Sequence, residues 1–285
     1  VRVIDNNDLS EREYFANMVF VNASTLGTTQ ILLNSKSKKY PNGIGNSSGV
    51  LGHYLMDHNY NAVISGTIDG YENEYYRGRR PTGIYIPNFY YEPDKSRPFL
   101  RGFAFAGGAS RETWRQLRGI DGIGVDYKQK LKEPGQWKFS LHGQGEMLPR
   151  FENHVSLDSS KKDKWGIPLL NIDCEYSENE KLMMEYAAVE ATKMLESAGV
   201  KNIKTKVNKS PPGLAIHEVG TARMGRDATT SYLNGFNQSH DIPNLFVTDG
   251  SSFASTATQN PSLTYMALTA RAVDYAVQEY KAKRI

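Results

Sequence analysis

The sequence predicts a protein of mixed α/β and α+β class, with one domain built from both chain ends and a second domain between them. Apolar runs at residues 16–22 and 244–249 have the uninterrupted hydrophobic character of buried parallel strands. From about residue 60 to 175, short alternating segments are separated by turn residues, which is typical of an antiparallel sheet. We therefore expect the two ends to pack together and the middle to form an inserted domain of antiparallel strands and helices.

The first apolar run predicts a strand that leads directly into a helix. Residues 23–25 are small (Ala-Ser-Thr), and residues 26–35 carry large aliphatic side chains at several positions. Strand, turn and helix in this order make half of a βαβ unit. Five glycines and prolines between residues 41 and 52 predict that a loop follows.

The middle of the chain predicts several short strands and helices. We expect strands at 61–68, 83–86, 98–105, 137–147 and 154–157, and short helices at 111–118 and 126–132. Ser177 and Glu180 have the spacing of a capping box, so a helix should begin there and end before Gly199. A strand is expected at 200–207, and the Pro-Pro-Gly sequence at 211–213 indicates a domain boundary.

The last part of the chain returns to the α/β pattern. Residues 214–219 predict a strand, and Asn260 and Pro261 open a long helix, because Asn is a good N-cap and Pro suits the first helical turn. Its apolar stripe comprises Leu263, Met266, Ala270, Val273, Val277 and Tyr280. The expected division is therefore 1–60, 61–212 and 213–285, with the first and third parts forming one domain.

The composition supports a folded protein and excludes several classes. Of the 285 residues, 39% are hydrophobic and 23% are charged, which suits a packed core. A net charge of +3 is too small to indicate nucleic-acid binding. No run approaches the ~18 uninterrupted apolar residues of a membrane-spanning helix. The single cysteine, Cys174, excludes an internal disulfide and a cysteine-based zinc site.

Two familiar catalytic patterns are absent or weak. The sequence has no G-x-G-x-x-G turn after a strand and no Walker A motif. Residues 45–49 match G-x-S-x-G around Ser47, with Asp173 and His217 following in the order of an α/β-hydrolase. That motif requires a strand before the serine and a helix after it, and neither is predicted here. A chance match in a glycine-rich loop is the favoured interpretation.

The six histidines do not predict a metal site. His53 and His58 lie five apart without the H-E-x-x-H context, so we expect hydrogen-bonding roles for them. His142, His154 and His240 are interpreted as structural. His217 ends an apolar segment before a glycine-spaced turn, and by itself this context favours a core histidine.

Three segments together carry a specific resemblance. Residues 217–225 are H-E-V-G-T-A-R-M-G, residues 244–250 are N-L-F-V-T-D-G, and residues 259–271 are Q-N-P-S-L-T-Y-M-A-L-T-A-R. In this order and separation they resemble the C-terminal signature of the glucose–methanol–choline (GMC) flavin oxidoreductases. Residues 17–35 and 151–168 are similar to further segments of that family, and the signature looks closest to bacterial gluconate-dehydrogenase and pyranose-oxidase members.

The resemblance implies the C-terminal half of an FAD-dependent enzyme that oxidises the CH–OH group of an alcohol or sugar, with hydride transfer to flavin N5. His217 would be the base that takes the hydroxyl proton, and Asn260 would orient the hydroxyl. The positive end of the helix opening at Asn260 would stabilise negative charge on the flavin. The implied FAD-binding residues are Ala23, Ser24, Asp249, Gly250, Asn260, Pro261 and Ser262.

The family's N-terminal portion, with its glycine-rich FAD turn, is not in this sequence. We therefore expect this chain alone to be incomplete, inactive and unable to retain FAD. The chain begins at Val1 with no leader-like segment, which we interpret as a processed chain or a fragment. The expected partners are a small alcohol or sugar and an electron-accepting subunit. The alternative is a non-catalytic sugar-binding or assembly module on the same fold.

Overall fold

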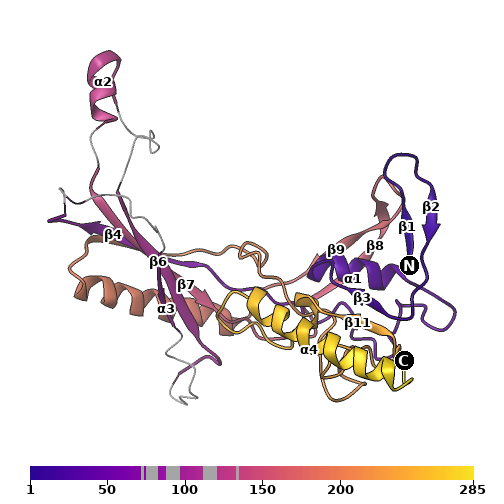
Figure 1. Cartoon of the computed structure of the whole chain (residues 1–285). Coiled ribbons are helices and arrows are strands. Elements are labelled where there is room, and N and C mark those ends of the chain that lie inside the picture. The colour runs from indigo at the N-terminus through magenta and orange to yellow at the C-terminus, as the bar shows by residue number, and fades with distance from the viewer. Residues whose placement is uncertain (72–73, 75–82, 88–96, 112–120, 133–134) are drawn as a thin grey trace. The chain divides into compact units, whose positions relative to one another are not determined.

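The computed structural model describes the whole chain except residues 72–73, 75–82, 88–96, 112–120 and 133–134 (Figure 1). The helix expected at 111–118 therefore lies almost entirely outside the described residues. None of the helices in the described part has both the length and the apolar character needed to cross a membrane.

The chain divides into two compact units. Unit 1 contains Val1–His58, Met147–Glu175 and Pro211–Ile285, and unit 2 contains Asn59–Glu146 and Tyr176–Ser210. The segment Met147–Glu175 thus belongs with the chain ends, whereas the sequence analysis included it in the stretch 61–212. The functions assigned to these parts of the chain stay predictions.

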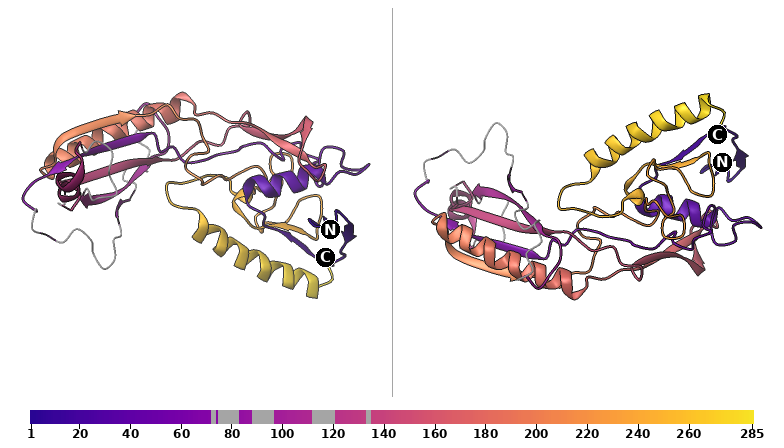
Figure 2. Two further views of the ribbon diagram at one scale, coloured as in Figure 1. Left: turned by 90° about the horizontal axis from the view of Figure 1, so that it is seen from above. Right: turned by 90° about the horizontal axis from the view of Figure 1, so that it is seen from below.

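Unit 1 is organised around two short parallel strands. Strand β3 (Val19–Val21) pairs in parallel with β11 (Leu245–Val247), as the two continuous apolar runs indicate. Helix α1 (Thr25–Asn34) follows β3 closely, and α4 (Ser262–Lys281) follows β11. The strand pair lies between these two helices (Figures 1 and 2).

The remaining elements of unit 1 are two antiparallel hairpins and one helical turn. They are β1 (Arg2–Ile4) with β2 (Glu11–Glu13), β8 (His154–Lys162) with β9 (Pro168–Asp173), and the 3₁₀ turn η1 (Gly250–Ser252). The buried core of the unit comprises Leu32, Leu33, Val50, Leu51, Ala222, Tyr232, Leu233, Leu245 and Val247. The core thus joins α1 and β11 to the loops around residues 50 and 222–233.

The orientation of α4 differs from what its sequence indicates. Leu263 and Met266 are 79% and 64% exposed, and Val273, Val277 and Tyr280 are also exposed. The buried positions of the helix are Ala272 and Ala276. The apolar stripe therefore lies on the exposed side of α4, and small alanines face the rest of unit 1.

The expected strand at 214–219 does not form. This segment consists of bends and an isolated bridge between Met56 and Val219. The alternating apolar residues Leu214 and Ile216 are exposed rather than buried. The prediction was wrong because the backbone N–H groups of Ala215 and His217 donate to the buried carboxylate of Asp57 and not to a neighbouring strand.

Unit 2 is an antiparallel sheet with helices, as predicted. Its strands run in the order β10 (Lys201–Val207), β4 (Ala62–Ile68), β7 (Trp137–Gly145), β6 (Phe103–Arg111) and β5 (Ile84–Ile86). The short helix α2 (Gly124–Lys130) lies between β6 and β7 in the chain. The strand expected at 98–105 begins only at Phe103, because residues 97–101 form bends.

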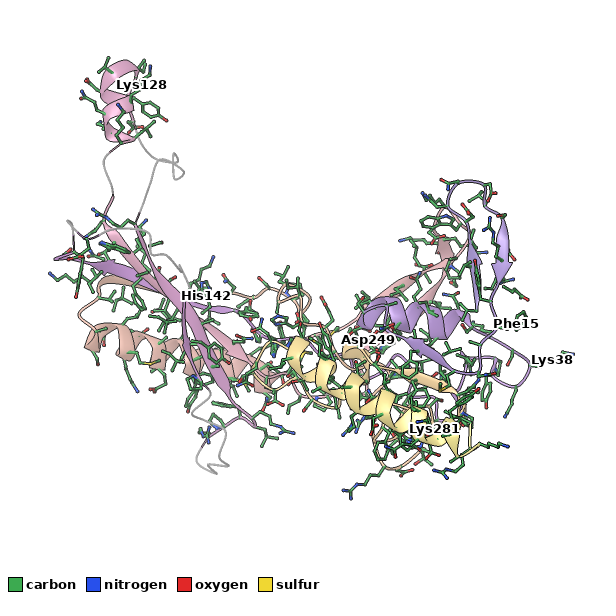
Figure 3. All side chains as sticks on the ribbon, viewed as in Figure 1. Phe15, Lys38, Lys128, His142, Asp249 and Lys281 are labelled. Carbon is green, nitrogen blue, oxygen red and sulfur yellow. The ribbon has the colours of Figure 1, made fainter. Side chains whose placement is uncertain are left out.

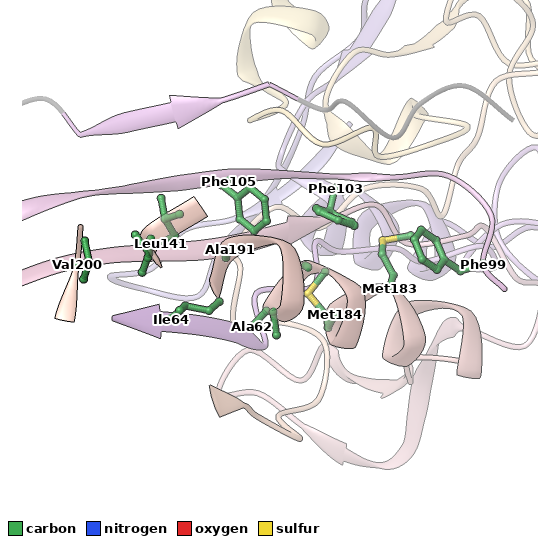
Figure 4. Close-up of a cluster of buried hydrophobic side chains, with 13 residues drawn as sticks. Ala62, Ile64, Phe99, Phe103, Phe105, Leu141, Met183, Met184, Ala191 and Val200 are labelled. Atoms are coloured by element: carbon green, nitrogen blue, oxygen red, sulfur yellow. The ribbon is translucent and has the colours of Figure 1, made fainter. Parts of the chain in front are cut away.

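Helix α3 (Glu178–Ser197) covers one face of this sheet. The Ser177 backbone N–H donates to the Glu180 carboxylate at 2.7 Å, which confirms the predicted capping box. Figure 4 shows the core between helix and sheet, where Met183 and Met184 lie near Phe103 and Phe105. Alternate residues of β4, β6 and β7 supply this core, as the period of a strand requires.

Candidate functional site

Three side chains of unit 1 form a hydrogen-bonded row. The Nδ1 atoms of His58 and His217 lie 2.8 Å apart, and His217 Nε2 lies 3.0 Å from Asn260 Nδ2. At the other end, His58 Nε2 lies 3.0 Å from the carbonyl oxygen of Ala257. The two residues that the sequence predicts to be catalytic, His217 and Asn260, are therefore in direct contact although 43 positions separate them.

A buried carboxylate holds the backbone of both histidines. Asp57 is 1% exposed, and its Oδ1 accepts hydrogen bonds from the backbone N–H groups of His58 at 2.8 Å and His217 at 3.1 Å. Its Oδ2 accepts from the N–H groups of Gly213 at 2.8 Å and Ala215 at 3.3 Å. The turn that presents His217 is therefore folded around one carboxylate.

The hydrogen bonds assign the tautomers of the two rings. A carbonyl oxygen can only accept, so His58 Nε2 must carry a proton that it donates to Ala257. A neutral His58 then has a lone pair on Nδ1, and His217 must donate its own Nδ1–H to it. The lone pair of His217 consequently lies on Nε2, where it accepts from the amide of Asn260.

The environment keeps His58 neutral. Burial and, to a lesser extent, the charge of the neighbouring His217 lower the pKa of His58 to about 4, against smaller opposing effects of Asp57 and of backbone hydrogen bonds. At pH 7 the ring therefore has one proton only. This agrees with the tautomer that the Ala257 carbonyl requires.

The residues predicted to bind FAD begin at the carboxyl ends of the two parallel strands. The Ala23 N–H donates to the Thr28 hydroxyl at 2.9 Å, and that hydroxyl donates to Asp249 Oδ2 at 2.5 Å. Ser24 precedes α1 with a φ of 68°. Asp249 lies just after β11 (Figure 3) and caps η1 by accepting from the Ser251 N–H at 2.9 Å.

Gly250 connects this cluster to the histidine site. A Cβ atom there would lie 2.8 Å from Thr25 Oγ1 and 3.0 Å from the carbonyl oxygen of Glu218, so only glycine fits without displacement. Thr25 Oγ1 in turn donates to the Glu218 carbonyl at 2.6 Å. Gly250 also accepts from the Gly220 N–H at 3.0 Å. The segment that carries His217 therefore packs directly on the ends of α1 and β11.

The start of α4 completes the predicted set. Asn260 lies before the helix, and its amide donates to His217 rather than acting as the cap that the sequence predicts. The helix begins after Pro261, and Ser262 Oγ lies 2.8 Å from the Tyr265 hydroxyl. The Thr269 hydroxyl donates to the Thr248 carbonyl at 3.0 Å, which anchors α4 at the carboxyl end of β11.

The described residues fit part of an FAD molecule. Helices α1 and α4 have no acidic residue in the first turn, so both N-termini can face the negative groups of a flavin nucleotide. Gly250 lets the segment after β11 pack closely on Thr25 at the start of α1, as a helix that packs tightly on a strand end requires. The glycine-rich turn that would hold the pyrophosphate does not occur in the sequence.

Asp57 and His58 are the site residues that sequence reasoning missed as functional. The expectation for His58 was a hydrogen-bonding role, and the structure confirms that role but joins it to His217. His53 instead stacks on the ring of Phe151, with centroids 3.8 Å apart. The only signal in the sequence was the adjacent pair Asp57-His58. Its role cannot be recognised without His217, which lies 159 positions away from His58.

The other chemical candidates lie elsewhere. Ser47 is in a turn with no strand directly before it or helix directly after it, and its hydroxyl donates to Asp241 at 2.8 Å, which argues against a hydrolase elbow. His142 is on β7 of unit 2, and the His240 ring contacts the Ser231 hydroxyl. Among the residues that the structure describes, no three His, Cys, Asp or Glu side chains cluster as a metal site would require.

Comparison with known proteins gives consistent matches. The chain is 33% identical over 283 residues to 2-methyl-1,2-propanediol dehydrogenase of Mycolicibacterium austroafricanum, covering 97% of this chain and 50% of that protein. It is 24% identical over 277 residues to the fructose dehydrogenase large subunit of Gluconobacter japonicus, covering 96% and 49%. The chain thus spans about half the length of these relatives.

A solved structure and a family model also match the chain. The structure matches a variant of formate oxidase from Aspergillus oryzae RIB40 with a TM-score of 0.66 at 15% sequence identity, covering 99% of this chain and 57% of that one. The family model described as GMC oxidoreductase matches residues 149–269, which include His217 and Asn260. Residues 149–269 therefore match the GMC oxidoreductase C-terminal domain, and nearly the whole chain is similar to the C-terminal half of such relatives.

Proposed function

We propose that this chain is the C-terminal part of an FAD-dependent oxidoreductase that oxidises the CH–OH group of an alcohol or sugar. The observation that carries the proposal is the row of His58, His217 and Asn260. It leaves a neutral imidazole with its lone pair on Nε2, 3.0 Å from an amide donor. A base and a hydrogen-bond donor at this separation are what removal of a hydroxyl proton requires.

In the proposed reaction, the substrate hydroxyl replaces the contact between Asn260 and His217. The hydroxyl donates to His217 Nε2 and its oxygen accepts from Asn260 Nδ2. His217 Nε2 takes the proton while the C–H bond gives up a hydride, and the alcohol becomes a carbonyl. The Asn260 side chain is exposed, so it can move aside without disturbing a packed core.

Bound FAD would supply the hydride acceptor. The residues that would hold it are Ala23 and Ser24 before α1, Asp249 and Gly250 after β11, and Asn260, Pro261 and Ser262 at the start of α4. The positive end of α4 would favour negative charge developing near it. The positive charge that His217 acquires would be balanced by the Asp57 carboxylate, which already binds its backbone N–H.

The names of the relatives support the substrate class. One relative is described as a diol dehydrogenase and another as the large subunit of a fructose dehydrogenase. We extend the proposal to a small alcohol or sugar as the substrate, and to a further subunit as the electron acceptor. FAD would be retained only when the segment with the pyrophosphate-binding turn is present.

A spectroscopic experiment tests the function. The flavin-containing protein that includes this chain should lose its oxidised-flavin absorbance when alcohols or sugars are added without oxygen. The His217→Ala variant should keep the absorbance and lose it much more slowly. A flavin that stays oxidised with every alcohol and sugar tried would reject the proposal and favour the non-catalytic binding module.

A further inference from the structure

We propose that His58 is a positioning residue that fixes the tautomer of His217, so that the lone pair of His217 stays on Nε2, beside Asn260. This inference rests on the proposed function, because it concerns how the base of that reaction is kept ready. His58 is 1% exposed, so it acts through His217 and not by touching the substrate.

The carbonyl of Ala257 determines the tautomer of His58. The carbonyl has no proton to give, so the 3.0 Å contact with His58 requires Nε2–H as the donor. That requirement leaves the other ring nitrogen of His58 as an acceptor. The 2.8 Å contact between the Nδ1 atoms then requires the proton to lie on His217.

The hydrogen bond from His217 to His58 also determines which nitrogen of His217 can accept the proton of the substrate hydroxyl. His217 Nδ1 already has its proton and its acceptor, so an incoming proton can bind only at Nε2. His58 does not compete for that proton, because its Nδ1 lone pair is occupied and burial disfavours its charged form. Proton transfer therefore needs no rearrangement of either ring.

The same contacts fix where the two reacting groups lie. The backbone N–H groups of His58 and His217 both donate to Asp57 Oδ1, which links His58 to the turn that carries His217. The ring Nε2 of His58 contacts the carbonyl of Ala257, in the loop that leads to Asn260. The base and the orienting amide come from separate segments, and His58 contacts both of them. Only a side chain with both a hydrogen-bond donor and an acceptor can satisfy both partners.

Ring-nitrogen NMR tests the tautomer directly. The flavin-containing protein is labelled with ¹⁵N-histidine, and long-range ¹H–¹⁵N correlations report which nitrogen of each ring carries the proton. The His217 signals are identified by their loss in the His217→Ala variant. We expect His217 to carry its proton on Nδ1 at pH 7 to 8. A wild-type His217 protonated on Nε2 would overturn the inference.

Substitutions of His58 test the consequence for catalysis. His58→Leu removes both nitrogens, and we expect His217 to shift toward the Nε2–H form. Anaerobic flavin reduction should slow by roughly 100-fold at saturating substrate with little change in KM, in line with the effect of outer partners on a site. His58→Gln can donate to Ala257 and accept from His217, so it should stay within about tenfold of the wild type.

A control variant and two different outcomes separate the role of His58 from that of His217. His154→Leu makes the same chemical change at another histidine of unit 1 and should leave the reduction rate unchanged. A wild-type rate for His58→Leu would overturn the positioning role even if His217→Ala is slow. A wild-type rate for His217→Ala would reject the proposed base instead, whereas the NMR result would still stand. If His58→Leu does not fold, the wild-type spectrum and His58→Gln decide.

Discussion

Asp57 Oδ1 accepts the backbone N–H of His217 at 3.1 Å, so a buried carboxylate determines where the base lies. The same carboxylate accepts from His58, Gly213 and Ala215. An N–H group that loses its acceptor inside a protein costs about 1–3 kcal/mol. The geometry of His217 therefore depends on a side chain that transfers no proton in the proposed reaction.

Replacement of Asp57 should reveal this dependence. Asp57→Asn keeps one oxygen but turns an NH₂ group toward N–H donors. We expect the free energy of unfolding to fall by about 1–3 kcal/mol, measured by urea denaturation. Asp274→Asn, on the exposed surface of α4, is the matched control. Equal stability of the two variants would show that the carboxylate does not hold the turn.

The second prediction concerns the base itself. His217→Ala should slow flavin reduction in the full flavin-containing protein by roughly 10²–10⁴-fold, the usual contribution of a general base. The flavin content should stay at the wild-type level, because the His217 ring is not expected to anchor the cofactor. Anaerobic stopped-flow measurements between pH 5 and 9 check the rate. An unchanged rate over this range would assign proton removal to another group.

The third prediction concerns the orienting amide. Asn260→Ala removes the donor that lies 3.0 Å from His217 Nε2. We expect flavin reduction to slow by about 10²-fold, because the hydroxyl is no longer held in line. Gln259→Ala changes the neighbouring exposed amide and serves as the control. Equal rates for these two variants would remove Asn260 from the mechanism.

Continuous apolar runs and capping patterns predicted the elements whose signals are local. Strands β3 and β11, the strands of the five-stranded sheet and helix α3 follow directly from hydrophobic period and from the Ser177–Glu180 pair. Strand β9 was missed although Leu170 and Ile172 alternate with Asn171 and Asp173, because the segment is only six residues long. The expected strand at 214–219 was also wrong, because the alternating residues Leu214 and Ile216 are exposed to solvent.

The site was predictable only in part, for a different reason. Family-like motifs indicated His217 and Asn260, and the structure brings their side chains into contact. The contribution of His58 depends on a contact across 159 positions, and that of Asp57 on four backbone N–H groups brought together by folding. No local spacing rule contains that information, because each partner lies on a separate segment.

The fourth prediction concerns Gly220, which follows the histidine turn. Its φ is 92°, and a Cβ atom there would collide with the carbonyl oxygen of Tyr54. Gly220→Ala should lower the free energy of unfolding by about 1–3 kcal/mol, through backbone strain and overpacking. The control is Gly235→Ala, where a Cβ atom would meet nothing within 4 Å. Thermal unfolding of both variants checks this, and equal midpoints would contradict it.

The last prediction follows from the lowered pKa of His58. Burial lowers that pKa to about 4 in the folded chain, whereas an unfolded histidine titrates near 6.5. Between these values the unfolded state binds more protons than the folded state, so the stabilisation present above pH 6.5 is lost as the pH falls toward 4. We expect His58 to contribute a decline of roughly 1 kcal/mol per pH unit in this window.

His58→Gln isolates that contribution, because glutamine does not titrate while the carboxylates of the chain are unchanged. Urea unfolding of the wild type and the variant at pH 8, 7, 6, 5 and 4 gives the difference in unfolding free energy at each pH. The wild type should lose stability relative to His58→Gln as the pH falls, and the two curves should run parallel above pH 7. Parallel curves down to pH 4 would mean that His58 does not titrate below its unfolded value, and its neutral form would need another explanation.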